Sequence, residues 1–186
     1  RDIPVITDVS PGSGFAASSN PSGKPWFGFQ GTQVEIRGYN LNNPSYHGRP
    51  NHKIYFGFTE AAILYQTANL IRVKVPAMES SGPHSLYIVY ATDEGTEETP
   101  HRSFHVYGPP VITNITPSII SAGGLLDITG SNLYSTYVYV GSSWGSPMEG
   151  ESGTHIFYTM PSGVGKPGDP VNIEVWNPAG SASREV

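Results

Sequence analysis

Several short segments of the chain alternate between apolar and polar residues. In residues 32–37, Val34 and Ile36 are separated by polar side chains, and residues 71–75 repeat this order. A period of two is typical of a β-strand with one buried face. Further apolar rows predict more strands, and these rows are Ile54, Phe56 and Phe58; Leu86, Ile88 and Tyr90; and Phe104 and Val106. The pattern therefore predicts an all-β protein.

The opening phrase of the chain occurs twice. Residues 4–11 read PVITDVSP, and residues 110–117 read PVITNITP, 106 positions later. Three more phrases return in the same order, at residues 38–41 and 130–133, 54–57 and 138–141, and 71–76 and 156–161. Self-similarity of this kind indicates repeated domains. We therefore expect one domain at residues 1–107 and a second at residues 108–186.

The distance between matching phrases falls along the chain, from 106 to 92 and then to 84 positions. This fall places two insertions in the first domain, of 14 residues (106 − 92) before Thr32 and of 8 residues (92 − 84) between Asn40 and Ile54. Length changes concentrate in surface loops, which often carry function. Gly38 and Gly130 end matching strands, so we expect both to be turn residues with positive φ.

The two domains meet at residues 106–110, a short segment that contains Pro109 and Pro110. Proline stiffens such a linker, so we expect the pair to hold one preferred arrangement. The chain starts at Arg1 and ends at Val186, where the counterpart of the strand with Phe104 should be forming. The sequence is therefore expected to be an excerpt of a longer protein, with its last strand either cut short or barely complete.

Both copies resemble IPT/TIG domains, the immunoglobulin-like domains of plexins, some transcription factors and many cell-surface proteins. The second domain carries the resemblance at residues 110–117, Gly123, Gly124, Ile128, Gly130, Asn132, Leu133, Val138, Val140, Gly141 and Pro161. The first carries it at Gly31, Ile36, Gly38, Asn40, Leu41, Ile54, Phe56, Gly57 and Pro76, with Gln30 in place of the first glycine. The resemblance implies two tandem immunoglobulin-like β-sandwiches. It implies no catalytic residue and no cofactor, because the motif is structural.

Composition and charge exclude several classes of partner. The net charge is -5 and only 13% of residues are charged, so no excess of Lys and Arg is available to bind nucleic acid. No apolar run approaches the roughly 20 residues that span a bilayer. Cysteine is absent, so no disulfide stabilises the fold. Gly and Pro, at 22 and 17 residues, favour a fold rich in turns.

Motifs for catalysis and metal binding are weak. Residues 141–145 read GSSWG, but a nucleophile elbow needs a following helix, so we expect an ordinary turn between strands. His101 and His105 would lie roughly 13 Å apart on a strand, too far to share a metal ion. The acidic residues 93–98 lack the alternating spacing of a calcium loop and are expected to be solvated. We predict no metal site.

One glycosylation sequon occurs, at Asn114-Ile115-Thr116. It lies in the predicted opening strand of the second domain, and Pro117 follows it directly. Asn114 is therefore either an ordinary strand residue, which the sequence favours, or a glycosylation site.

Aromatic residues gather in the two insertions. The first contains Trp26, Phe27 and Phe29, and the second contains Tyr46 and His47. Exposed aromatic side chains in a loop can bind a partner protein or a sugar. They can also fold back and cap the open end of the first sandwich. The five residues are our candidate partner-contact site.

These observations predict a non-enzymatic pair of modules from a larger extracellular or cell-surface protein or filamentous assembly. The pair would act as a stiff spacer and contact other proteins, either neighbouring domains or other subunits. A second hypothesis is an accessory or carbohydrate-binding module of a secreted polysaccharide-active protein. A third is an intracellular signalling or transcription module. The domains that flank the pair in the parent gene would separate the three.

Overall fold

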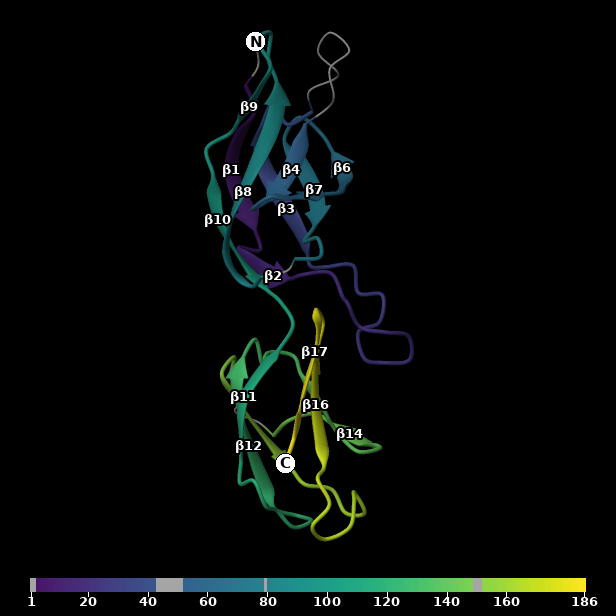
Figure 1. Ribbon diagram of the computed structural model, residues 1–186. Helices are drawn as coiled ribbons and strands as arrows, with labels where there is room; N and C mark the ends of the chain where they lie inside the picture. Colours follow the sequence, from purple (N-terminus) through teal and green to yellow (C-terminus); the bar gives the residue numbers. More distant parts are fainter. Residues whose placement is uncertain (1–2, 43–51, 79, 149–151) are drawn as a thin grey trace. The chain divides into compact units, whose positions relative to one another are not determined.

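The computed structural model describes residues 3–42, 52–78, 80–148 and 152–186, and these form seventeen β-strands and no helix (Figure 1). No helix in the described ranges is therefore long and apolar enough to cross a membrane. The absence of helix in these ranges agrees with the alternating pattern of the sequence, because a period of two places every second side chain in the core.

The chain divides into two compact units. The first unit contains residues 1–17 and 30–107, and the second contains residues 18–29 and 108–186. Most of the first insertion therefore folds with the second unit, although the sequence-based division at residue 107 groups it with the first domain. The chain passes between the units three times, after Ala17, after Phe29 and after Tyr107.

The first unit holds two sheets. In one sheet the strand order is β1–β3–β7–β6, with bounds Val5–Ser10, Gln33–Tyr39, Leu70–Lys74 and Ile63–Gln66. In the other it is β2–β10–β8–β4–β5, with bounds Ser13–Phe15, Arg102–Tyr107, Gly82–Ala91, Lys53–Phe56 and Thr59–Ala61, and β9 (Thr96–Glu98) pairs with β8. All pairs are antiparallel except β2 with β10. Such antiparallel sheets are typical of immunoglobulin-like sandwiches.

The second unit repeats this plan with fewer strands. One sheet has the order β11–β12–β15, with bounds Val111–Thr116, Leu125–Ser131 and His155–Thr159. The other has the order β14–β13–β16–β17, with bounds Ser143–Gly145, Tyr137–Val140, Asn172–Asn177 and Gly180–Glu185. The opening strands of both units show a register shift against their neighbours, at Ile6 to Asp8 in β1 and at Ile112 to Asn114 in β11. The internal repeat is therefore a repeat of structure.

The core of each unit is built from residues of both of its sheets. In the first unit Ile36 of β3 and Phe56 of β4 are fully buried, and Phe56 meets Phe104 edge to face with 5.0 Å between ring centroids. In the second unit Ile128 of β12 and Val140 of β13 belong to one buried cluster. The predicted all-β sandwich fold is confirmed.

Phe58 corrects one predicted strand. The sequence places it in an inward row with Ile54 and Phe56, but its side chain is 100% exposed. Strand β4 ends at Phe56, and Gly57 has a positive φ of 59° that turns the chain toward β5. The strand therefore ends at Phe56, two residues before the end that the apolar pattern indicates.

Gly38 and Gly130 correct a second expectation. They lie inside β3 and β12 and not in turns, and the positive φ belongs to Asn40 and Asn132, at 55° each. A Cβ atom on either glycine would overlap a backbone carbonyl oxygen of the opening strand, that of Val5 for Gly38. The two glycines are needed for close backbone approach next to a β-bulge.

Candidate interaction surface

The candidate contact residues of the first insertion lie partly at the surface of the second unit. Trp26 is 39% exposed and Phe27 is 61% exposed. Trp26 has a φ of 60°, a conformation that non-glycine residues rarely adopt and that needs support from its surroundings. Tyr46 and His47, the candidates from the second insertion, lie outside the described residues.

Hydrogen bonds fix the start of the insertion to the turn between β16 and β17. The backbone N–H and the hydroxyl of Ser19 both donate to the carbonyl oxygen of Ala179, each at 3.0 Å. The amide group of Asn20 donates to the carbonyl of Asn177 at 2.9 Å and to that of Pro25 at 3.0 Å. Asn20 is only 6% exposed, so these bonds are largely shielded from water.

Asn177 holds the turn between β16 and β17 in place. Its side chain is fully buried, and its amide group donates to the carbonyls of Gly108 and Asn132, at 3.0 and 2.9 Å. Its side-chain oxygen accepts from the backbone N–H groups of Ala179 and Gly180. Every polar group of this side chain is therefore satisfied, as burial demands. The turn that receives the insertion is fixed in place.

The sheet next to this turn presents aromatic rings to solvent. In β13 the side chains of Val138 and Val140 point into the core, so Tyr137 and Tyr139 point outward. Tyr139 lies directly opposite Trp144 of β14, and Tyr137 lies directly opposite Trp176 of β16. Cross-strand neighbours of this kind are close enough for their rings to meet.

The rings form one connected group, which we call the aromatic strip and which consists of Trp26, Tyr137, Tyr139, Trp144 and Trp176. Tyr139 and Trp144 stack with 6.0 Å between centroids and 18° between planes. Tyr137 meets Trp144 at 5.5 Å, and Tyr139 meets Trp176 at 6.2 Å. Trp26 adds the insertion to the group through Tyr137, at 6.5 Å. Four strip residues thus come from three neighbouring strands, and the fifth comes from the insertion.

Lys24 and Glu174 lie on the strip as a charge pair. The Nζ atom of Lys24 is 4.9 Å from the ring centroid of Tyr139 and 5.0 Å from that of Trp176, within cation–π range. It is also 3.8 Å from a carboxylate oxygen of Glu174. That carboxylate accepts from the indole N–H of Trp176 at 3.0 Å and from the amide of Asn172 at 3.3 Å. The strip is therefore locally neutral.

The first unit carries a smaller aromatic stack on the corresponding sheet. Tyr55 and Tyr87 face each other across β4 and β8, with ring centroids 5.5 Å apart, and Tyr87 also stacks on His101 at 4.2 Å. Tyr87 is 8% exposed, and its burial raises the pKa of its hydroxyl. An ion pair between Lys53 of β4 and Glu60 of β5, at 2.9 Å, raises the pKa of Lys53. The central ring of this stack, Tyr87, is therefore covered, while Tyr55 is half-buried and His101 is exposed.

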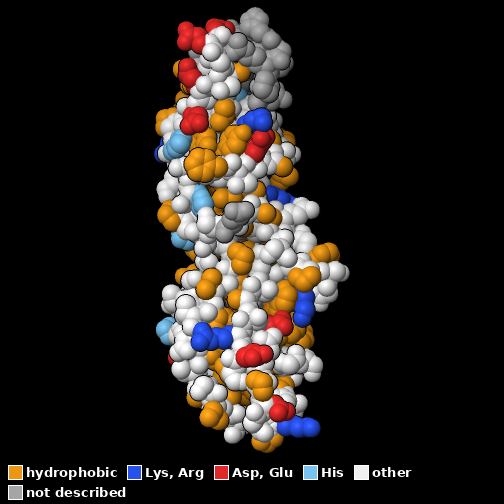
Figure 2. Space-filling view, viewed as in Figure 1, with side chains coloured by type: hydrophobic (Ala, Val, Ile, Leu, Met, Phe, Trp, Pro, Cys, Tyr) orange, Lys and Arg blue, Asp and Glu red, His pale blue; other side chains and the backbone are white. Residues whose placement is uncertain are grey.

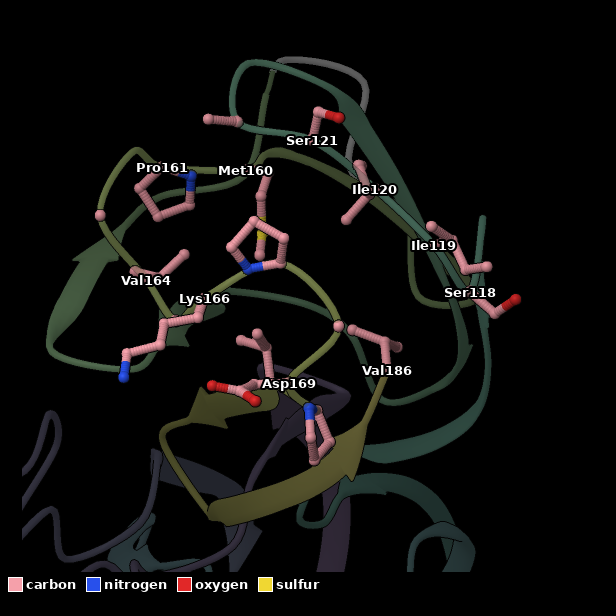
Figure 3. Close-up of a pocket in the computed structure, with 17 residues that line it drawn as sticks. Ser118, Ile119, Ile120, Ser121, Met160, Pro161, Val164, Lys166, Asp169 and Val186 are labelled. Atoms are coloured by element: carbon pink, nitrogen blue, oxygen red, sulfur yellow. The ribbon is translucent and has the colours of Figure 1, made fainter.

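A pocket of about 590 Å³ opens at one end of the second unit (Figure 3). Its apolar lining includes Ile120, Met160 and Val164, and its charged lining includes Lys166 and Asp169. Figure 3 shows Met160 and Ile120 directed toward the same space. The wall is made largely of the connections β11–β12 and β15–β16.

The structure also places the weaker motifs of the sequence. Residues 141–145 form the β13–β14 turn and strand β14, as expected, and the described residues that follow them form no helix. Within the described ranges, no group of three or more His, Asp or Glu side chains could hold a metal ion. Asn114 is exposed in β11, where its carbonyl accepts from the Thr129 hydroxyl, and its glycosylation stays a prediction.

Sequence reasoning missed four residues of the strip, Tyr137, Tyr139, Trp144 and Trp176. The signal was present in the alternating order Tyr-Val-Tyr-Val of residues 137–140, which assigns both tyrosines to the outer face. The sequence order alone cannot give the pairing of these residues with β14 and β16.

Figure 2 shows that charged side chains are sparse on the viewed face and that hydrophobic side chains lie between the other residues of this surface.

Comparisons with known proteins identify one family. The family model for the IPT/TIG domain matches residues 4–103 and 110–185, and no curated protein matches the chain. The extracellular region of plexin A4 is 20% identical over 98% of the chain, which spans 18% of that protein, with a TM-score of 0.49. SGBP-B from a xyloglucan utilization locus in Bacteroides uniformis is 16% identical over 98%, with 48% of it covered and a TM-score of 0.40. An I-band fragment of titin is 11% identical over 99%, with 63% covered and a TM-score of 0.34.

Proposed function

The chain belongs to the IPT/TIG domain family, and we propose that it acts as a non-enzymatic spacer that holds and presents neighbouring parts of a larger extracellular or cell-surface protein. The family consists of non-catalytic immunoglobulin-like domains, so its members contribute a scaffold and contact surfaces. In this proposal the partners are proteins, either adjacent domains or other subunits of an assembly.

The observation that supports the spacer most directly is the insertion that crosses into the second unit. Residues 18–29 are part of the first family segment, yet they belong to the second compact unit. Asn20 and Ser19 anchor them there through hydrogen bonds that are largely removed from water. Two domains that move freely need only one connecting segment. Three crossings of the chain, together with an insertion anchored on the second unit, would restrict the motion between the units and so suit a spacer.

The spacer is tested by the width of an inter-unit distance distribution. Because the sequence has no cysteine, Ser103→Cys with Ser183→Cys gives two exposed positions that label cleanly, one in each unit. Pulsed electron spin resonance on the labelled pair should give a narrow distribution. Adding Ser19→Ala and Asn20→Ala, which remove the anchoring bonds, should broaden it. A distribution in the unaltered pair as broad as that of domains on a flexible Gly–Ser linker would overturn the proposal.

A further inference from the structure

We propose that the aromatic strip of the second unit binds a neutral oligosaccharide, of the kind whose sugar rings present flat C–H faces. This activity goes beyond the spacer function and does not depend on it. The ligand class follows from three properties of the surface, namely exposed ring faces, flanking hydrogen-bonding groups and a lysine that is already paired with a carboxylate.

The exposed ring faces lie at the edge of the sheet. Trp144 is 60% exposed, and β14 is the last strand of its sheet, so the indole packs on Tyr139 and still presents most of its surface to solvent. Trp26 adds a second exposed indole from the insertion. The C–H face of a pyranose is apolar and packs on such a ring, as other flat apolar groups do.

Hydrogen-bonding groups flank the rings at the right positions. Glu174 lies directly opposite Tyr139, and Ser183 of β17 lies directly opposite Glu174. Asn172 and Ser181 occupy outward positions of the same face, because they differ from these residues by two along their strands. Carboxylate, amide and hydroxyl groups beside a stacking ring match the hydroxyl rim of a sugar.

Charge selects a neutral ligand. The carboxylate of Glu174 and the ammonium of Lys24 lie 3.8 Å apart, and Lys24 is further occupied by two ring faces. An acidic sugar would have to break this arrangement to reach the cation, and a basic group would compete with Lys24 for the carboxylate. The strip thus offers hydrogen bonds beside a compensated charge pair, and Glu185 of β17, which lies opposite Asn172 on the same face, would repel an acidic sugar.

A protein partner fits this surface less well. The outward positions of β13, β14, β16 and β17 carry aromatic, Ser, Asn and Glu side chains, and none of these positions carries Leu, Ile, Val or Met. Protein contacts that bury an aromatic anchor surround it with further well-packed, dry surface. Here the surroundings of the rings are polar, which suits a small hydroxylated ligand.

Calorimetric titration of the intact chain with neutral oligosaccharides tests the proposal. The probes are cello-, xylo-, manno-, laminari- and malto-hexaose, with oligogalacturonate as the acidic comparison. We expect at least one neutral probe to bind, and Trp144→Ala to weaken its binding about tenfold or more, equal to about 1.4 kcal/mol, because the sugar loses the ring on which it stacks. Phe58→Ala, which removes a fully exposed ring from the first unit, should leave binding unchanged.

Three outcomes would overturn the proposal. One is that none of the five neutral probes binds to the folded chain. Another is that a probe binds equally well to Trp144→Ala, with circular dichroism showing both proteins folded. The third is that the acidic probe binds better than every neutral one. None of these results bears on the distance distribution that tests the spacer, so the two proposals fail separately.

Discussion

Gly38 and Gly130 each lie where a neighbouring backbone leaves no room for a side chain. A Cβ atom at Gly130 would overlap the carbonyl oxygen of Val111, and the same holds for Gly38 and Val5. We expect Gly130→Ala to lower the free energy of unfolding of the second unit by about 1–3 kcal/mol, because β11 must move away from β12. All three tryptophans lie in the second unit, so denaturant unfolding followed by tryptophan fluorescence measures this change.

Gly12→Ala is the matched control for this substitution. Gly12 has ordinary backbone dihedrals and open space where a Cβ atom would lie. It lies in the first unit, so its effect is followed by circular dichroism, and it should change the free energy of unfolding by less than about 0.5 kcal/mol. If Gly130→Ala unfolded at the same denaturant concentration as the unaltered chain, the close approach of β11 and β12 would have no energetic consequence.

His52 gives the first unit a dependence on pH. The ring is 3% exposed and lies against Tyr90, with 6.4 Å between centroids. Burial lowers the pKa of His52 below its ordinary value of about 6.5, and the Leu41 backbone opposes this in part. Below pH 6.5, His52 therefore binds a proton in the unfolded chain but stays largely unprotonated in the folded chain until the pH reaches its lower folded pKa. The stability from this group is complete above pH 6.5 and is lost as the pH falls toward the folded pKa.

The prediction for His52 is a difference in slope. Between pH 6.5 and the folded pKa, the free energy of unfolding of the first unit should fall by at most about 1.4 kcal/mol per pH unit because of this residue. His52→Phe should remove that part of the slope, since the ring is replaced by one that does not titrate. Amide hydrogen exchange of β4 and β8, measured across this range, reports the first unit. Parallel pH profiles for the two proteins would contradict the assignment.

At the scale of residues, the sequence predicts which positions matter for the fold better than it predicts why they matter. The repeat identifies Gly38 and Gly130 as equivalent, but the reason for glycine there is a neighbouring strand that local sequence cannot show. Phe58 continues an apolar alternation, yet Gly57 turns the chain before it. Burial depends on where a strand ends, and a pattern of apolar residues does not mark that end.

At the scale of elements, the docking of the insertion should affect one unit and not the other. Asn20→Ala removes the donor to the Asn177 carbonyl, so the second unit should lose about 1–2 kcal/mol. The matched control is Asn69→Ala, which removes a bond from Asn69 to the Gly38 carbonyl inside the first unit. The denaturation midpoint followed by tryptophan fluorescence should fall for Asn20→Ala and stay unchanged for Asn69→Ala. Equal midpoints for Asn20→Ala and the unaltered chain would show that the insertion rests on the unit without stabilising it.

The strands themselves were predictable, and the fate of the insertion was not. Alternation over residues 32–37 and 71–75 is a local signal, and β3 and β7 form where it lies. Asn20 instead bonds to a residue 157 positions away. No periodicity records such a contact, so the aromatic residues of the insertion were found from the sequence, but the four rings they join were not.

At the scale of the whole molecule, the fold could be predicted because its sequence pattern occurs twice along the chain. Repeated phrases, in order and with insertions between them, fix two copies of one sandwich. Function is less accessible, because the glycines and prolines that make the family motif support the fold alone. The partner-binding features are side chains such as Trp144, whose neighbours depend on strand pairing.

The second unit should be less stable when it is separated from the residues that cross into it. A chain of residues 108–186 lacks the donors from Ser19 and Asn20, and it uncovers Trp176, which is 5% exposed in the complete protein. We expect it to unfold about 1–3 kcal/mol more easily by tryptophan fluorescence. Joining residues 18–29 to its start through a flexible Gly–Ser linker should restore most of the loss, because the insertion can then dock as before. If the separated unit matched the intact chain, or if the joined insertion restored nothing, residues 18–29 would not be an energetic part of the second unit.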